Sequence, residues 1–129
     1  MDISELMTQG AHEEGAEVEI FHPEDRDKSM GVFFAVLGID SMAFQSAEKK
    51  AYNKQVVTYR KSGELSEDQT IELEIAQIVA VVTGWRGIEN GTKDVPYSKE
   101  KCLELMTKSP WLRKQIERFV DERKNFTKG

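Results

Sequence analysis

The first periodic stretch of the sequence alternates apolar and charged residues, and a longer apolar run follows it. Over residues 16–22, two branched aliphatic residues alternate with two glutamates, which is the period of a half-buried strand. Pro23 ends this pattern because proline has no N–H for a strand ladder. Residues 30–39 are almost continuously apolar over the length of a strand. The sequence therefore predicts a β-hairpin whose tip is formed by residues 25–29.

Helical periodicity follows the hairpin. Asp40 or Ser41 is a suitable N-cap for a first helix that extends to about residue 61. A second helix begins at Ser66, and Gln69 three residues later completes a capping box. Apolar residues surround much of this second helix, so we expect it to be the central one. The first helix has an apolar stripe at helical spacing, formed by Phe44, Ala47, Ala51, Tyr52, Val56 and Tyr59.

Two shorter helices are predicted to follow a shaped loop. Three glycines and a proline punctuate residues 84–97, which is typical of a loop of defined shape. Ser98 caps a short third helix, and Ser109 with Pro110 begins the last one. The predicted fold class is α+β, in which a small N-terminal β-hairpin packs with about four α-helices. The last helix is expected to turn its basic residues outward, namely Arg113, Lys114, Arg118, Arg123 and Lys124.

Length and charge bound the organisation of the chain. Its 129 residues predict one domain over residues 17–126, preceded by a partly disordered acidic N-terminus over residues 1–16. The net charge of −5 is unevenly spread: residues 1–40 contain ten acidic and two basic residues, whereas residues 99–129 contain nine basic and five acidic ones. The two ends could join copies head to tail into a homo-oligomer, attract one another within a monomer, or simply be solvated faces.

Composition and targeting signals indicate where the protein acts. No apolar run approaches the ~20 residues of a membrane span, so we expect no membrane association. The first ten residues lack the basic and apolar regions of a signal peptide. Cys102 is the single cysteine, which excludes an internal disulfide and fits a reducing cytoplasm.

Catalytic chemistry is hard to find in the sequence. His12 and His22 are the only histidines, and the carboxylates beside His12 indicate an acidic surface rather than a metal site. Cys102 lies in a predicted amphipathic helix without a neighbouring histidine, which favours a buried structural thiol over a nucleophile. Phosphate-binding, dinucleotide-binding, calcium and zinc-protease motifs are absent. We therefore expect no enzyme, no cofactor and no metal.

Two kinds of partner remain to be weighed. The basic last helix, with Trp111 and Phe126 nearby for stacking, leaves a small phage or bacterial nucleic-acid-binding regulator as the alternative. Interleaved acidic residues and an acidic chain argue against nucleic acid, which usually selects a concentrated positive face.

Apolar residues point instead to a protein partner. The hairpin and first helix contain more large apolar residues than a two-stranded hairpin needs, and such residues adapt to helical or extended partners. The alternative is that helices of the same chain cover them. The candidate partner-binding residues are Phe33, Phe34, Met42 and Phe44.

A family resemblance rests on three short segments in a fixed order. These are VVTGWRGIENG at 81–91, VPYS at 95–98, and SPWLRKQIERFV at 109–120 with a closing NF at 125–126. Together they resemble the tail assembly chaperone family of long-tailed, non-contractile, lambda-like bacteriophages, over roughly residues 70–126. We expect the motif to be mainly structural, with Trp85 closing the core and its indole N–H meeting a loop carbonyl. The motif residues are Trp85, Gly87, Ile88, Pro96 and Tyr97.

The resemblance implies a function. Family members bind the long helical tape measure protein in the host cell cytoplasm, keep it soluble, and are absent from the mature virion. They also help recruit the tail tube (major tail) protein, in many phages through an extended form made by a programmed frameshift. This chain resembles the short form, and the resemblance supplies no fixed contact residues.

Overall fold

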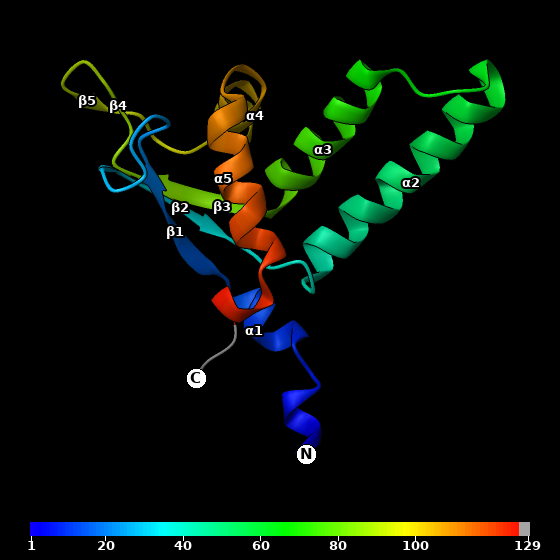
Figure 1. Ribbon diagram of the computed structural model, residues 1–129, viewed down its shortest axis with the longest axis horizontal. Helices are drawn as coiled ribbons and strands as arrows, with labels where there is room; N and C mark the ends of the chain where they lie inside the picture. Colours follow the sequence, from blue (N-terminus) through cyan, green and yellow to red (C-terminus); the bar gives the residue numbers. More distant parts are fainter. Residues whose placement is uncertain (127–129) are drawn as a thin grey trace.

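The computed structural model describes residues 1–126 and has an antiparallel sheet at its centre (Figure 1). Strands β1 (Ala16–Phe21) and β2 (Ser29–Val36) form the predicted hairpin, with Val18 opposite Phe34. A third strand, β3 (Val82–Arg86), pairs with the other edge of β2 and gives the order β1-β2-β3. The sequence analysis missed β3 because this strand follows a helix without a turn and has a glycine at its centre.

Four longer helices accompany the sheet, as the sequence predicted, and the α+β fold class is confirmed. They are α2 (Met42–Ser62), α3 (Glu67–Val81), α4 (Lys99–Lys108) and α5 (Pro110–Asp121). Three of the expected caps are present: Ser41, Ser66 and Ser98 each accept a hydrogen bond from a backbone N–H of the first turn. Ser109 precedes Pro110 at the start of α5 as expected, but its side chain makes no capping hydrogen bond. The helix α3 contacts α2, α4, α5 and β3, which confirms its central position.

The hydrophobic core lies between the sheet and the helices α3, α4 and α5. The sheet contributes Phe34 and Val36, and each of the three helices turns one side toward them. We call this part of the molecule the body. The side chains that the helices bury in it are Ile75, Ile78, Val81, Cys102, Met106, Leu112, Ile116 and Val120.

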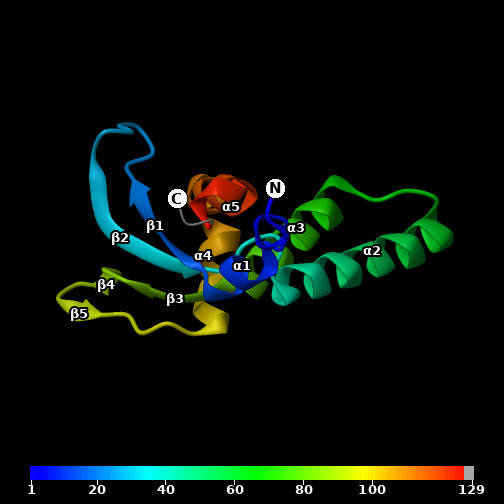
Figure 2. The ribbon, with the colours of Figure 1, turned by 90° about the horizontal axis from the view of Figure 1, so that it is seen from below.

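The helices α2 and α3 form an antiparallel pair that projects from the body as an arm (Figures 1 and 2). Of the 21 residues of α2, only Ala51 is buried, whereas α3 inserts its C-terminal half into the core. The predicted apolar stripe of α2 is therefore covered only in part, and Tyr52 and Tyr59 are 64% and 63% exposed. No helix among residues 1–126 has both the length and the hydrophobicity to span a membrane.

The acidic N-terminus is anchored to the body by His12. This residue lies in the short helix α1 (Gln9–Glu14), which follows the 3₁₀ turn η1 (Ile3–Glu5). Its side chain is fully buried and stacks on Phe126 with ring centroids 4.9 Å apart. The expectation that His12 lies on an acidic surface is wrong, because the carboxylates that follow it point outward while the ring points inward.

Hydrogen bonds fix the buried histidine. Its Nδ1 accepts from the backbone N–H of Asp40 at 3.0 Å. The Asp40 carboxylate accepts from the Thr8 hydroxyl and from Nε and Nη2 of Arg123. A Cβ on Gly38 would lie 2.0 Å from Nδ1, so a side chain there would displace the ring. Burial lowers the pKa of His12, and the hydrogen bonds of Asp40 lower its pKa to about 2.

Arg113 is a second residue whose predicted position is wrong. It was expected on the outer face of the last helix, but only 5% of it is exposed. Its Nη1 donates to the carbonyl of Met106 at 3.2 Å, in the last turn of α4, and its Nε lies 3.4 Å from Glu117. A helix end leaves carbonyls without partners, and a long side chain with a charged tip can satisfy one while its stem packs in the core.

The predicted loop contains a small hairpin and two anchoring aromatic residues. The strands β4 (Glu89–Asn90) and β5 (Lys93–Asp94) form the hairpin. The Trp85 indole N–H donates to the carbonyl of Val95 at 2.8 Å, which confirms the predicted contact with a loop carbonyl. The Tyr97 hydroxyl donates to the carbonyl of Val82 at 2.8 Å, so the C-terminal end of the loop is fixed to β3 by two hydrogen bonds.

The other residues of the predicted motif occupy different surroundings. Gly87 has a φ of +88°, and a Cβ there would lie 2.0 Å from the carbonyl oxygen of Gly31. Only glycine allows this close approach of the two backbones. Ile88 is half-buried against the core, and Pro96 is exposed.

Candidate partner-binding groove

The four predicted partner-binding residues do not share one surface. Phe34 is fully buried in the core and lies edge-on to Trp85, so its assignment as a contact residue is wrong. Alternation along β2 puts Phe33 on the opposite face of the sheet, where the Arg86 guanidinium covers it at 3.8 Å from the ring centroid. Phe44 is half-buried against the core. Met42 is 68% exposed at the start of α2.

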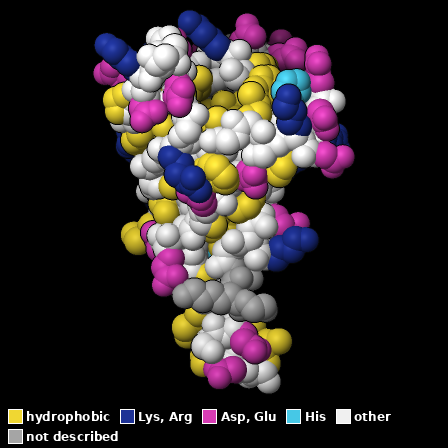
Figure 3. Space-filling model, turned by 90° about the vertical axis from the view of Figure 1, so that its left-hand side faces the viewer, with side chains coloured by type: hydrophobic (Ala, Val, Ile, Leu, Met, Phe, Trp, Pro, Cys, Tyr) yellow, Lys and Arg dark blue, Asp and Glu magenta, His cyan; other side chains and the backbone are white. Residues whose placement is uncertain are grey.

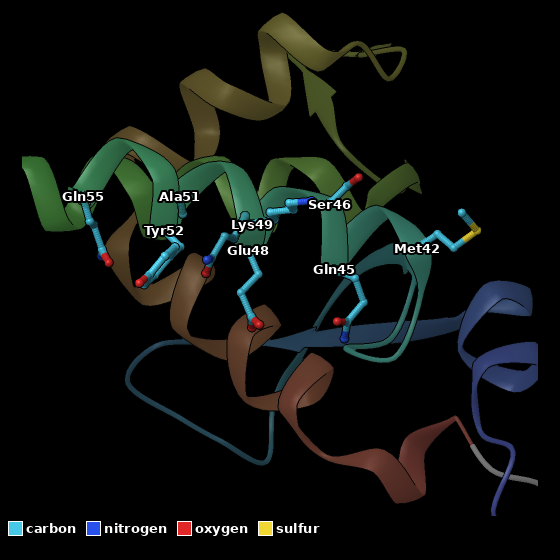
Figure 4. Close-up of a pocket in the computed structure, with 9 residues that line it drawn as sticks. Met42, Gln45, Ser46, Glu48, Lys49, Ala51, Tyr52 and Gln55 are labelled. Atoms are coloured by element: carbon cyan, nitrogen blue, oxygen red, sulfur yellow. The ribbon is translucent and has the colours of Figure 1, made fainter. Parts of the chain in front are cut away.

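Met42 marks one end of a groove of about 740 Å³ that follows α2. Figure 4 shows its side chains projecting from successive turns of this helix, with Tyr52 and Gln55 at the other end. From Met42 to Gln55 the helix extends about 20 Å, because each residue adds about 1.5 Å. The lining residues are Met42, Gln45, Ser46, Glu48, Lys49, Ala51, Tyr52, Gln55 and Gln77.

The groove continues toward the tip of the arm. A smaller pocket of about 340 Å³ shares Tyr52 and Gln55 with it and adds Tyr59 and Leu65. We call the combined surface from Met42 to Leu65 the α2 groove. The sequence identified Met42 as a candidate contact residue and assigned Tyr52 and Tyr59 only to an apolar stripe, because helical spacing cannot show how far such a stripe is covered.

The chemistry of the α2 groove suits binding to another protein. Methionine and tyrosine offer adaptable apolar contacts, and three glutamine amides can donate and accept hydrogen bonds. A long, shallow surface of this composition fits an amphipathic helix.

Charges on the arm are separated between its two helices. The helix α2 has five basic residues and one acidic residue, whereas α3 has four acidic residues and no basic one. No ion pair within 4.0 Å joins the two helices in residues 1–126. These charges therefore remain accessible to a partner.

The remaining candidate chemistry does not gather into a site. Within the described chain, no group of three or more His, Cys, Asp or Glu side chains is arranged to hold a metal ion. Cys102 is buried, and burial raises the pKa of its thiol to about 11, so it is not a thiolate at neutral pH. That the protein is not an enzyme stays a prediction.

The residues proposed for nucleic-acid stacking are separated in the structure. Phe126 is buried against His12, whereas Trp111 is half-buried at the other end of α5. Trp111 lies in a different pocket, with Lys114 and Arg118 from α5. Since Arg113 is also buried, the basic face of α5 is smaller than the sequence suggested.

Comparison with known proteins identifies the family. A family model described as YdaY prophage protein matches residues 39–129, which is more than half of the chain. The matched range contains the arm, β3, α4 and α5, and it includes the segments on which the resemblance to tail assembly chaperones rests. No curated protein and no solved structure matches the chain. The chain belongs to the YdaY prophage protein family and is thus phage-derived.

Proposed function

We propose that this phage-derived protein is a tail assembly chaperone that binds the tape measure protein through the α2 groove and keeps it soluble. The observation that carries the proposal is the exposed arm, whose α2 helix buries a single residue while Met42, Tyr52 and Tyr59 remain exposed. The phage origin of the family and the resemblance of residues 70–126 support the same role.

The geometry of the groove suits a long helical partner. The part of the α2 groove from Met42 to Gln55, about 20 Å long, can contact about four turns of a partner helix, at 5.4 Å a turn. One such contact is weak, but many copies along one tape measure protein would cover its apolar stripes and gain from multivalency. An exposed apolar surface on the tape measure protein would otherwise cause aggregation.

The proposal also assigns a place and a second partner. The protein would act in the host cell cytoplasm and would not remain in the mature virion. It would help to bring the tail tube protein to the tape measure protein, through an extended frameshift form where the phage makes one. No membrane or nucleic acid takes part in this role.

The decisive experiment is co-expression with the tape measure and tail tube proteins of the same prophage. We expect the tape measure protein to be soluble only in the presence of the chaperone, and to co-purify with it. Tyr52→Glu, which puts a charge in the α2 groove, should abolish co-purification. Val57→Glu is the matched control, because Val57 is 51% exposed on α2 but lies outside the groove.

Other outcomes would assign the function differently. If Tyr52→Glu retains the tape measure protein and Phe33→Glu loses it, the outer face of the sheet is the binding surface. If no tail protein co-purifies and the wild-type protein shifts DNA in a salt-sensitive manner, it is a nucleic-acid-binding regulator instead.

A further inference from the structure

A second pocket, of about 400 Å³, lies between the tip of the β1–β2 hairpin and α5. Its wall is held in place by Gln115, whose side chain accepts from the Phe21 N–H at 3.0 Å and donates to the Phe21 carbonyl at 2.8 Å. The hairpin contributes Phe21, His22, Pro23 and Arg26, and α5 contributes Trp111, Lys114, Gln115 and Arg118. We call it the α5 pocket.

The α5 pocket combines aromatic walls with positive charge. Phe21 and Trp111 are half-buried and leave part of each ring accessible. No carboxylate lines the pocket, and its three cations, Arg26, Lys114 and Arg118, take part in no ion pair within residues 1–126. A ligand that fits this chemistry has negative charges next to large apolar side chains.

Residues 1–7 of the same chain have that chemistry. Asp2 and Glu5 alternate with large apolar residues that are 66% to 98% exposed. The segment projects from the body, and Figure 3 shows hydrophobic and acidic side chains together on this projection. Exposed apolar side chains of this size are costly to leave in water. They are Met1, Ile3, Leu6 and Met7.

The segment and the pocket lie at opposite ends of the molecule. The C-terminal end of α5 leads to Phe126, which stacks on His12 in α1, whereas Trp111 is in the first turn of α5. Twelve residues of α-helix separate these ends by about 18 Å. Seven extended residues span about 24 Å, so folding back would bring only the first two residues to the pocket and would unwind η1.

We infer that residues 1–7 of one copy bind in the α5 pocket of the next copy, so that copies associate head to tail. The carboxylates of Asp2 and Glu5 would lie against Arg26, Lys114 and Arg118, and the apolar side chains against Trp111. Such a contact joins two different surfaces and leaves a free segment and a free pocket at the ends, so it can extend. The inference is independent of the tape measure protein and does not use the α2 groove.

The test uses two variants of the full chain, each lacking one half of the contact. The segment variant is Ile3→Ser with Leu6→Ser, and the pocket variant is Lys114→Glu with Arg118→Glu; all four positions are exposed. Sedimentation of the wild-type protein should show association that grows with concentration. Each variant alone should associate at least about tenfold more weakly. An equimolar mixture should form a dimer and nothing larger, because it contains one working segment and one working pocket.

A competition experiment covers the case in which a variant does not fold. A synthetic peptide of residues 1–9 should dissociate the wild-type assembly, and a scrambled peptide of the same composition should not. Raising the salt concentration several-fold should weaken the assembly. The Debye length, about 8 Å at physiological salt, becomes shorter, so opposite charges attract one another less. The matched control, Lys50→Glu with Lys54→Glu on the arm and outside the α2 groove, should associate like the wild type.

The inference would be overturned by any of three results. These are a wild-type protein that stays monomeric at all concentrations, folded variants that assemble like the wild type, and a mixture of the two variants that forms no dimer.

Discussion

The body and the arm bury very different fractions of similar residues. In the body, Phe34, Met106 and Ile116 are fully buried, and aromatic rings meet edge-on across the sheet. In the arm, α2 has comparable apolar residues, yet Tyr52 and Tyr59 remain mostly exposed. The contacts that stabilise the fold are therefore concentrated in the body, whereas the apolar surface of the arm remains exposed.

The accessible surface of the whole molecule agrees with this division. The protein exposes 8979 Å² for a mass of 14.7 kDa. A compact monomer of this mass exposes about 6,900 Å². The additional surface, about 2,000 Å², compares with the ~800 Å² that each partner buries in a standard protein interface. The arm and residues 1–7 both project from the body and contribute to this additional surface.

The largest contrast should appear when one aromatic ring is removed from each region. Phe34→Ala should lower the free energy of unfolding by about 3–5 kcal/mol, because it opens a cavity in a packed core. Tyr59→Ala in the arm should change it by less than about 0.5 kcal/mol, since an exposed ring makes few contacts. Urea denaturation followed by circular dichroism measures both. Equal losses would mean that the arm is part of the folded core.

Acid should destabilise the body through the buried His12 and Asp40. The folded state lowers both pKa values, so the unfolded state binds more protons and stability falls as the pH falls. For His12 the loss begins near the ordinary histidine pKa of about 6.5. For Asp40 it extends from pH 3.8 to about 2. The Asp40 contribution amounts to at most about 2–3 kcal/mol.

The variant Asp40→Asn separates the contributions of His12 and Asp40 to the loss of stability at low pH. The variant should be less stable at neutral pH, and its stability should no longer decrease between pH 4 and pH 2 on account of this residue. The loss near pH 6 should persist, because it belongs to His12. Unfolding measured at intervals from pH 7 to pH 2 tests this, and an unchanged profile in the variant would assign the acid loss to other groups.

Local signals in the sequence predicted most of the secondary structure. Alternation and an apolar run identified β1 and β2, and hydroxyl caps located the starts of α2, α3 and α4 because a cap acts within one helical turn. The strand β3 was missed because its partner, β2, lies far earlier in the chain, with Phe34 opposite Trp85 and Val36 opposite Val82. Long-range pairing of this kind leaves no local pattern in a five-residue segment.

Burial was harder to predict than secondary structure. Adjacent Phe33 and Phe34 must face opposite sides of a strand, but their order does not show which side is covered. His12 and Arg113 are polar residues whose burial depends on distant partners, namely Phe126 and Met106. Tyr52 shows the converse case, because helical spacing predicts an apolar stripe but does not show that the tertiary structure leaves this part of the stripe exposed.

Trp85 connects the sheet to the loop that follows it, and its hydrogen bond can be removed while most of its packing is kept. Trp85→Phe should lower stability by about 1–2 kcal/mol, because the Val95 carbonyl loses its partner. Tyr97→Phe is the matched change, since it removes only the hydroxyl that donates to Val82. Thermal unfolding measures both. If Trp85→Phe has no effect, water replaces the indole N–H and the loop is not fixed by this contact.

Removing a helix N-cap should have the smallest effect on stability. It compares the arm and the body most directly, because the same type of cap, a serine, can be replaced in each. Ser66 begins α3 in the arm, and Ser98 begins α4 in the body; each side chain accepts a hydrogen bond from a backbone N–H three residues later. Replacing such a cap with alanine costs about 1 kcal/mol. At Ser98 this cost should appear in global unfolding, because α4 packs in the core.

At Ser66 the same loss should remain local. The first turns of α3 lie at the tip of the arm, where no residue before Ile75 is buried, so they can open while the body stays folded. In Ser66→Ala, hydrogen exchange in residues 67–71 should become about fivefold faster, since a free-energy difference of about 1 kcal/mol corresponds to that factor. The global free energy of unfolding should change by less than about 0.5 kcal/mol. If Ser66→Ala and Ser98→Ala lower global stability equally, the arm and the body unfold as one cooperative unit. The arm that carries the α2 groove would then not unfold independently of the body.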